Sequence, residues 1–140
     1  MFLGTYEHSV DTKGRVFLPV KLSCNLGENF VITRTIYDCV SIYREYDWEK
    51  YVEKLEALPN YKYGNLKRLI YSRTVTASMD SQGRVLLPVK LRDDLGLKGE
   101  VVIVGNNTSI EIWAKDNWVK MEKELEESVQ TIEFGEGVDL

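Results

Sequence analysis

The sequence predicts a mainly β fold with helices, of the α+β class, in which two similar halves pack about a pseudo-two-fold axis. The main observation is a repeat: residues 8–22 return as residues 77–91, and ten of the 15 positions are identical. Each half is too small to close a core alone, since a small sheet needs a second layer. We therefore expect a single domain over 1–140, with an interleaved β-barrel and peripheral helices.

The similarity continues beyond the repeat with a slight drift in register. Residues 30–33 match 101–104, and residues 40–43 match 110–113. Because the order of elements is the same in each half, duplication explains the pattern better than chance.

The first half is expected to hold four strands and a short helix: strands at 6–10 and 15–18 around a turn at 11–14, a helix from 19 to about 25, and a hairpin of 30–34 with 40–43. Asp11 and Gly14 stand first and fourth in the turn, which a type I turn favours. Pro19 suits the start of a helix, because its missing N–H is not needed there. Gly27 ends that helix.

A longer helix follows, for which Asp47 is a plausible N-cap. Its apolar stripe has helical spacing and consists of Trp48, Tyr51, Val52, Leu55 and Leu58. Pro59 ends the helix. Residues 60–65 read as a polar, flexible connection, and 66–71 as one or two helical turns.

The second half repeats this order, with a strand at 74–77, a short helix at 88–95 and a closing helix from about Asn117. The expected divisions are a first half of about 5–58, a connection of about 59–73, a second half of about 74–130 and an acidic tail of about 131–140. The glycines and negative charge of the tail predict fraying.

The charge is unevenly distributed along the 140 residues. The formal net charge is −4, yet residues 121–140 alone carry a net −6, which leaves residues 1–120 at +2. The acidity therefore need not lie near a binding face. If the body binds phosphate, it must use a local cluster or repeat a small patch across several subunits.

The sequence offers no apolar stretch long enough to span a bilayer and no secretory leader. We therefore expect an intracellular, cytoplasmic protein without a membrane partner. Cys24 and Cys39 have no metal-type spacing, and two reduced, packed thiols are expected.

The two copies of the turn carry the candidate binding residues. Lys13 and Arg15 hold positions in the first copy that Gln82 and Arg84 hold in the second. An Arg beside a tight turn on a two-stranded ribbon can enter a major groove and read guanine, whereas Lys can contact phosphate. The alternative is structural: Asp11 and Asp80 form salt bridges to these arginines and lock the turns. Both roles are compatible, since an Asp can fix the turn while a basic side chain points outward.

Catalysis has little support in the sequence. His8 is the only histidine, and no phosphate-binding glycine loop, nucleophile elbow or zinc spacing is present. We expect no catalytic residue, no metal, no cofactor and no small-molecule substrate. Trp48 and Trp118 begin amphipathic helices, so core packing is expected of them rather than base stacking.

These residues resemble the MraZ family. The opening residues 1–4, the turn 11–15 followed by Pro19, and the turn 80–84 followed by Pro88 are similar to its paired hallmark motifs. The family is related to AbrB-type regulators, so the resemblance implies a duplicated AbrB-like swapped-hairpin barrel within one chain.

The resemblance also implies a bacterial transcriptional regulator that binds double-stranded DNA at short direct repeats upstream of its own division and cell-wall gene cluster. It implies a homo-oligomeric ring associated with the nucleoid. The DNA-contacting positions carried over are Lys13, Arg15 and Arg84; Gln82 stands where the first copy has Lys13, so the first turn is expected to contribute more. Turn-structuring roles fall to Asp11, Gly14, Asp80 and Gly83.

Two alternatives stay open. The first is a protein-interaction module, such as the antidote of a toxin–antidote pair, which would use the acidic C-terminal segment or an exposed helix face. The second is an enzyme on a related β-barrel, for which no constellation of residues is present.

Overall fold

The computed structural model describes residues 1–140 as an antiparallel α+β structure, which confirms the predicted class. One sheet has six strands in the order β1-β7-β8-β4-β3-β5, and a second sheet pairs β2 with β6. The strands are β1 (Thr5–Val10), β2 (Arg15–Phe17), β3 (Phe30–Thr33), β4 (Val40–Arg44), β5 (Val75–Ala77), β6 (Arg84–Leu86), β7 (Gly99–Asn106) and β8 (Ser109–Ala114). The helices are α1 (Val20–Ser23), α2 (Glu45–Glu56), α3 (Asn60–Ser72), α4 (Val89–Leu95) and α5 (Lys115–Gln130).

The strand pairing exchanges elements between the two copies of the repeat. Strand β1 pairs with β7, and its counterpart β5 pairs with β3. The registers correspond, because His8 faces Val101 in one pair and Ala77 faces Phe30 in the other. Strands β4 and β8 pair directly with each other, and so do β2 and β6. Each copy of the repeat therefore completes its sheet with strands of the other.

Strands β1 and β2 flank the first turn but do not pair with each other along their length. The turn between them is closed by the bond from the Asp11 N–H to the Arg15 carbonyl, at 2.9 Å. Beyond that bond the strands separate, and each pairs with a strand of the other copy. Local turn chemistry closes the loop, whereas burial of apolar side chains decides the pairing partners.

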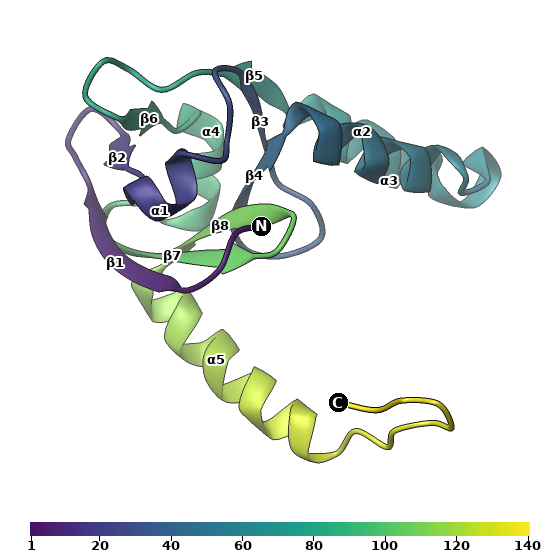
Figure 1. The fold of residues 1–140 in the computed structure, drawn as a ribbon. Coiled ribbons are helices and arrows are strands. Elements are labelled where there is room, and N and C mark those ends of the chain that lie inside the picture. The colour runs from purple at the N-terminus through teal and green to yellow at the C-terminus, as the bar shows by residue number, and fades with distance from the viewer.

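The hydrophobic core lies between the six-stranded sheet and the layer of β2, β6, α1 and α4 (Figure 1). Val16 and Val85, at the centres of β2 and β6, are almost fully buried and face each other in register. Leu22 of α1 and Leu91 of α4 are buried at equivalent places in the repeat. The repeated motif thus supplies the core as well as the turns.

Helices α2 and α3 lie side by side and project from the body (Figure 1). Two expectations fail here. Helix α2 begins at Glu45, and Asp47 is a buried ion-pair partner of Arg44 (2.6 Å) instead of the N-cap. The segment expected to be a flexible connection is the first half of α3, which begins directly after Pro59.

Tertiary contacts explain why α3 is continuous. Its Ile70 is 1% exposed, and its Lys67 is 6% exposed although lysine is a charged residue. The Lys67 ammonium donates to the Leu58 carbonyl at 2.6 Å and to Asn60 Oδ1 at 2.8 Å. One lysine therefore ties the C-terminal end of α2 to the start of α3.

Helix α5 leaves the body on another side and leads to the acidic tail (Figure 1). It begins at Lys115, two residues before the expected Asn117, and none of its residues is buried. After Gln130 the chain has no further helix or strand. None of the five helices has the length and hydropathy that a membrane span requires.

Candidate nucleic-acid interface

The first turn, residues 11–15, is fixed by a single carboxylate. Asp11 Oδ1 accepts hydrogen bonds from the backbone N–H groups of Lys13 (3.0 Å) and Arg15 (2.8 Å). Asp11 Oδ2 accepts the Nε–H of the Arg15 guanidinium at 2.8 Å. Gly14 completes the turn with φ of 85°, a conformation that suits glycine.

The second turn, residues 80–84, has the same geometry. Asp80 Oδ1 accepts the N–H groups of Gln82 and Arg84, each at 2.9 Å, and Asp80 Oδ2 accepts the Arg84 Nε–H at 2.7 Å. Gly83 has φ of 78°. Each aspartate therefore bonds both to turn amides and to the arginine four residues on. We call this set of bonds, made by Asp11 with Arg15 and by Asp80 with Arg84, the lock; the structural alternative is thus present in both copies.

The lock lowers the pKa of both aspartates from the ordinary value of 3.8. The largest cause is the backbone N–H of the arginine four residues on, to which the guanidinium of the same arginine adds. Hydrogen bonds to an ionised carboxylate favour its charged form. The turns are thus most stable with both carboxylates ionised.

Acid should weaken the fold through these turns. Since the folded pKa lies below the unfolded one, the stabilisation is present above about pH 4 and is lost as the pH falls through the lower folded pKa. We expect the double variant Asp11→Asn, Asp80→Asn to be less stable at neutral pH and to lose less stability on acidification. Melting temperatures between about pH 7 and about pH 3 test this; equal acid sensitivity of the double variant and the wild type would contradict it.

The lock leaves part of each arginine free. Only Nε is bonded to the aspartate, and the terminal amino groups of Arg15 and Arg84 have no hydrogen-bond partner within the chain. Both side chains lie on the outer face of the β2–β6 ribbon, where Arg15 pairs with Leu86 and Phe17 with Arg84. The Arg84 guanidinium lies 5.9 Å from the Phe17 ring centroid. The lock aims each guanidinium and leaves two amino groups free to donate to a ligand.

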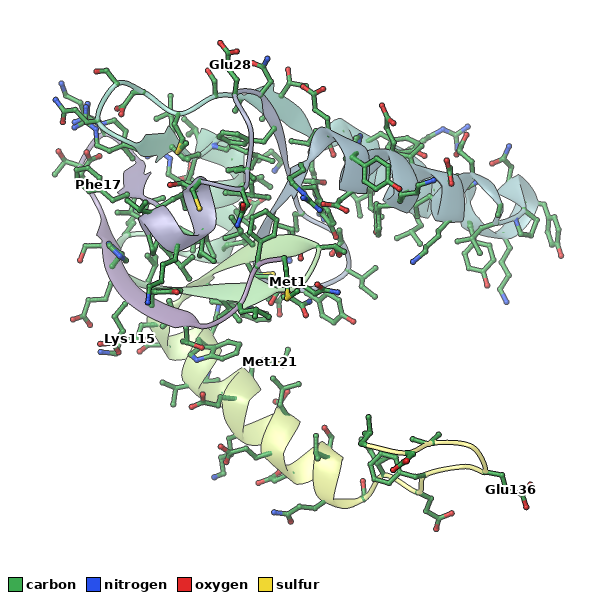
Figure 2. All side chains as sticks on the ribbon, viewed as in Figure 1. Met1, Phe17, Glu28, Lys115, Met121 and Glu136 are labelled. Carbon is green, nitrogen blue, oxygen red and sulfur yellow. The ribbon has the colours of Figure 1, made fainter.

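Two further side chains on this face were missed in the sequence. Phe17 is 49% exposed and Leu86 is 59% exposed at the equivalent place. Phe17 lies at the outer edge of the body, far from α5 (Figure 2). The strand periodicity contains the signal, because the buried Val16 and Val85 require their neighbours to point outward.

The polar residues at the tips are also accessible. Lys13 and Gln82 are exposed, as are Lys21 and Lys90 just after the prolines that precede α1 and α4. Residues 11–22 carry three cations and one carboxylate, and residues 80–91 carry two cations and one carboxylate. The β2–β6 ribbon and its two flanking turns are therefore locally basic, although the whole chain is acidic.

Arg92 breaks the symmetry between the turns, and no local sequence pattern predicts this role. Its Nε–H donates to the Leu87 carbonyl at 2.9 Å, and its guanidinium occupies the space beside Gly14 that a Cβ would need. Ser23 holds the equivalent position in the first copy, and nothing lies within 4 Å of a Cβ at Gly83. The first turn is thus buttressed by the second half, whereas the second turn has no such support.

This asymmetry predicts unequal effects of two equivalent substitutions. Gly83→Ala should destabilise by about 1–2 kcal/mol, because alanine is strained at positive φ. Gly14→Ala should cost about 1 kcal/mol more, since Arg92 must also give up its bond to Leu87. Urea unfolding of both variants measures the difference, and a larger loss in Gly83→Ala would contradict it.

Other candidate sites are not supported by the geometry. No three His, Cys, Asp or Glu side chains cluster so as to hold a metal. Trp48 packs on Tyr51 (5.6 Å) and Trp118 on Trp113 (5.7 Å), which confirms packing roles for these tryptophans. Both cysteines are free as expected, but Cys24 is exposed instead of packed.

Comparison with known protein families gives a match over most of the chain. The family model described as "MraZ protein, putative antitoxin-like" matches residues 1–63 and 70–134. The chain therefore belongs to the MraZ family, as the sequence motifs indicated.

Curated relatives match along most of their length. A protein of Heliobacterium modesticaldum is 36% identical over 134 residues, which is 94% of each chain. Proteins of Lachnoclostridium phytofermentans and Carboxydothermus hydrogenoformans are 40% and 41% identical over 84% of each chain. All three are named "Transcriptional regulator MraZ".

Proposed function

We propose that this protein is a transcriptional regulator that binds double-stranded DNA sequence-specifically through its two turns and the β2–β6 ribbon. The observation that carries the proposal is the duplicated lock, in which each aspartate holds an arginine by Nε and leaves its terminal amino groups free. The names of the relatives support a regulatory role. No enzymatic activity is proposed.

A two-stranded ribbon fits the width of the DNA major groove. In this arrangement Arg15 and Arg84 donate to base edges, guanine O6 and N7 being the best acceptors for a guanidinium. Lys13 contacts phosphate as a point charge, and Gln82 bonds to phosphate or a base edge. Because the aspartate restricts rotation of each arginine, less side-chain entropy is lost on binding.

The ribbon and turns of a single subunit carry few cations, so we propose that affinity comes from repetition. Several subunits in a homo-oligomeric ring would bind consecutive short direct repeats, and avidity raises affinity by orders of magnitude without new contacts. We place the repeats upstream of the protein's own division and cell-wall gene cluster, and the protein in the cytoplasm at the nucleoid. The acidic tail, residues 131–140, would then lie away from the DNA.

We further propose that the fold is an AbrB-like swapped-hairpin barrel, with halves of about 5–58 and 74–130 joined by 59–73. The exchanged pairs β1–β7 and β3–β5 support this, as does the direct pairing of β2 with β6. The antiparallel pairing of β2 with β6 sets the two turns at opposite ends of one short ribbon, so that both flank its outer face.

Fluorescence anisotropy with DNA from upstream of the gene, against scrambled DNA of equal length, tests the function over a salt series. The proposal predicts a preference for the upstream duplex that persists as salt is raised. Equal, weak and strongly salt-dependent binding to both duplexes would indicate phosphate contact alone and contradict it.

A second candidate function is that of an antidote-like interaction module. The antitoxin wording of the family description favours it, as do the exposed α5 and the acidic tail. Purification of the tagged protein from its own cells tests it. A partner recovered in equal amount, and lost on removal of residues 131–140, would support this function; recovery of the protein alone would exclude it.

A further inference from the structure

A groove outside the turns combines aromatic walls with a carboxylate. It lies between α5, β7, β8 and the loop after β3, has a volume of about 250 Å³, and is called the aromatic groove below. Its principal side chains are Tyr37, Glu111, Trp113, Trp118, Met121 and Leu125. Met121 lies on the first turns of α5, where the helix leaves the body (Figure 2).

Glu111 is the charged group of this groove and has no cationic partner. No Lys or Arg nitrogen lies within 4.0 Å of its carboxylate, although most buried or partly buried charges in the chain are paired. One of its oxygens accepts a hydrogen bond from the Trp113 indole N–H, at 3.2 Å. Burial raises the pKa of Glu111, against the hydrogen bonds from Trp113 and Asn106. A partly desolvated carboxylate of this kind gains free energy from a cation brought beside it.

The aromatic walls favour the same kind of ligand. The ring of Trp118 packs on the buried ring of Trp113, with centroids 5.7 Å apart at 56°, so Trp118 and Tyr37 provide the accessible aromatic surface of the groove. Tyr37, 50% exposed, stands at the rim. Aromatic faces carry negative potential and attract organic cations, most strongly when the cation is partly desolvated.

The other half of the molecule shows that this arrangement is not a requirement of the fold. Ser41 holds the position equivalent to Glu111, and the two residues pair directly across β4 and β8. There Tyr43 stacks on Tyr51 at 5.6 Å, and Tyr71 of α3 packs against Trp48 at 6.5 Å. Helix α5 has no counterpart of α3 over it, so the equivalent apolar surface is open only beside Glu111.

We propose that the aromatic groove binds a small organic cation, with Glu111 as counter-ion and Trp118 and Tyr37 as aromatic walls. The ligand class is an alkylammonium or guanidinium compound, because the site offers one anion and mainly apolar surface. The volume suits a cationic head group with a short chain and is small for a larger cofactor. This site is independent of the two turns and of the proposed DNA binding.

Indole fluorescence of the full chain tests the proposal directly. The background variant Trp48→Phe leaves Trp113 and Trp118 as the only indoles. Choline is titrated as the probe, and its neutral isostere 3,3-dimethylbutanol is titrated in parallel. We expect a saturable change with choline and binding of the isostere that is about tenfold weaker or worse, since only choline carries the charge.

Two substitutions of glutamate make the test specific to the groove. Glu111→Gln should abolish choline binding, whereas Glu28→Gln, at an exposed glutamate outside the groove, should leave it unchanged. Circular dichroism and DNA binding by each variant establish that it is folded. If Glu111→Gln does not fold, the comparison of choline with its isostere on the wild-type groove decides alone.

Three results would overturn the proposal. They are no saturable change with choline up to tens of millimolar, equal binding of the isostere, or unaltered choline binding by folded Glu111→Gln. A fourth result would also overturn it. If Glu111→Gln changes the mass measured by sedimentation, and the Trp48→Phe background binds no choline, Glu111 pairs with a cation of a second subunit instead of a ligand.

Discussion

Arg15→Ala is expected to weaken binding to the upstream DNA by about 1–3 kcal/mol per site, or roughly 5- to 150-fold, and to relax sequence preference. The reason is that the Arg15 guanidinium is held by Asp11 through Nε and offers its terminal amino groups outward. In an oligomer the loss recurs at every subunit, so the apparent effect grows. Fluorescence anisotropy with upstream and scrambled duplexes measures both affinity and preference.

Two matched variants separate base reading from charge. Arg15→Lys keeps the positive charge but loses the planar fork, so it should lose preference while retaining part of the affinity. Lys13→Ala should weaken binding to both duplexes equally. It should also reduce the slope of log affinity against log salt concentration by about 1, the value for one lost phosphate contact. Arg84→Ala should resemble Arg15→Ala with a smaller effect, because the second turn has no equivalent of the Arg92 buttress. Unchanged preference in folded Arg15→Ala would refute the assignment of the reading residue.

Phe2→Ala is expected to lower the free energy of unfolding by about 3–5 kcal/mol, the range for large-to-small changes of a buried aromatic. The Phe2 side chain is 0% exposed, and its backbone exchanges two 2.8 Å hydrogen bonds with Asn107. The segment lies so close to Gly105 that a Cβ added there would collide with the Leu3 backbone nitrogen. Urea unfolding monitored by circular dichroism measures the loss.

Leu3→Ala is the control for this prediction. Leu3 adjoins Phe2 but is 60% exposed, so its truncation should change stability by no more than about 0.5 kcal/mol. Similar effects of the two substitutions would show that the N-terminal segment does not anchor the core as the structure indicates.

Most of the features that could be predicted from the sequence lie in the repeated motif, residues 8–22 and 77–91. Asp and Gly at fixed places specify the turns through local hydrogen bonds, and alternation in the flanking strands follows from burial of Val16 and Val85. The proline and glycine signals likewise located α1 and α4 within a few residues. Features set by neighbours in sequence were therefore accessible to sequence reasoning.

Features set by distant contacts were not. The helix over residues 60–72 depends on Ile70 packing and on Lys67 reaching the Leu58 carbonyl, neither of which polarity along the chain reveals. The partners of β1 and β2 depend on closure of a core shared by both halves. Arg92 acts across the halves, and its contact with the first turn has no signal in local sequence.

Photochemical cross-linking tests the central claim most directly. The wild-type protein is bound to an upstream DNA duplex that carries bromodeoxyuridine within the proposed DNA repeat, and the complex is irradiated. The cross-linked peptides are then identified by mass spectrometry. The account predicts cross-links within residues 11–22 and 80–91, which contain both turns and the exposed Phe17 and Leu86. Cross-links confined to α3 or α5, with none in these two segments, would contradict it.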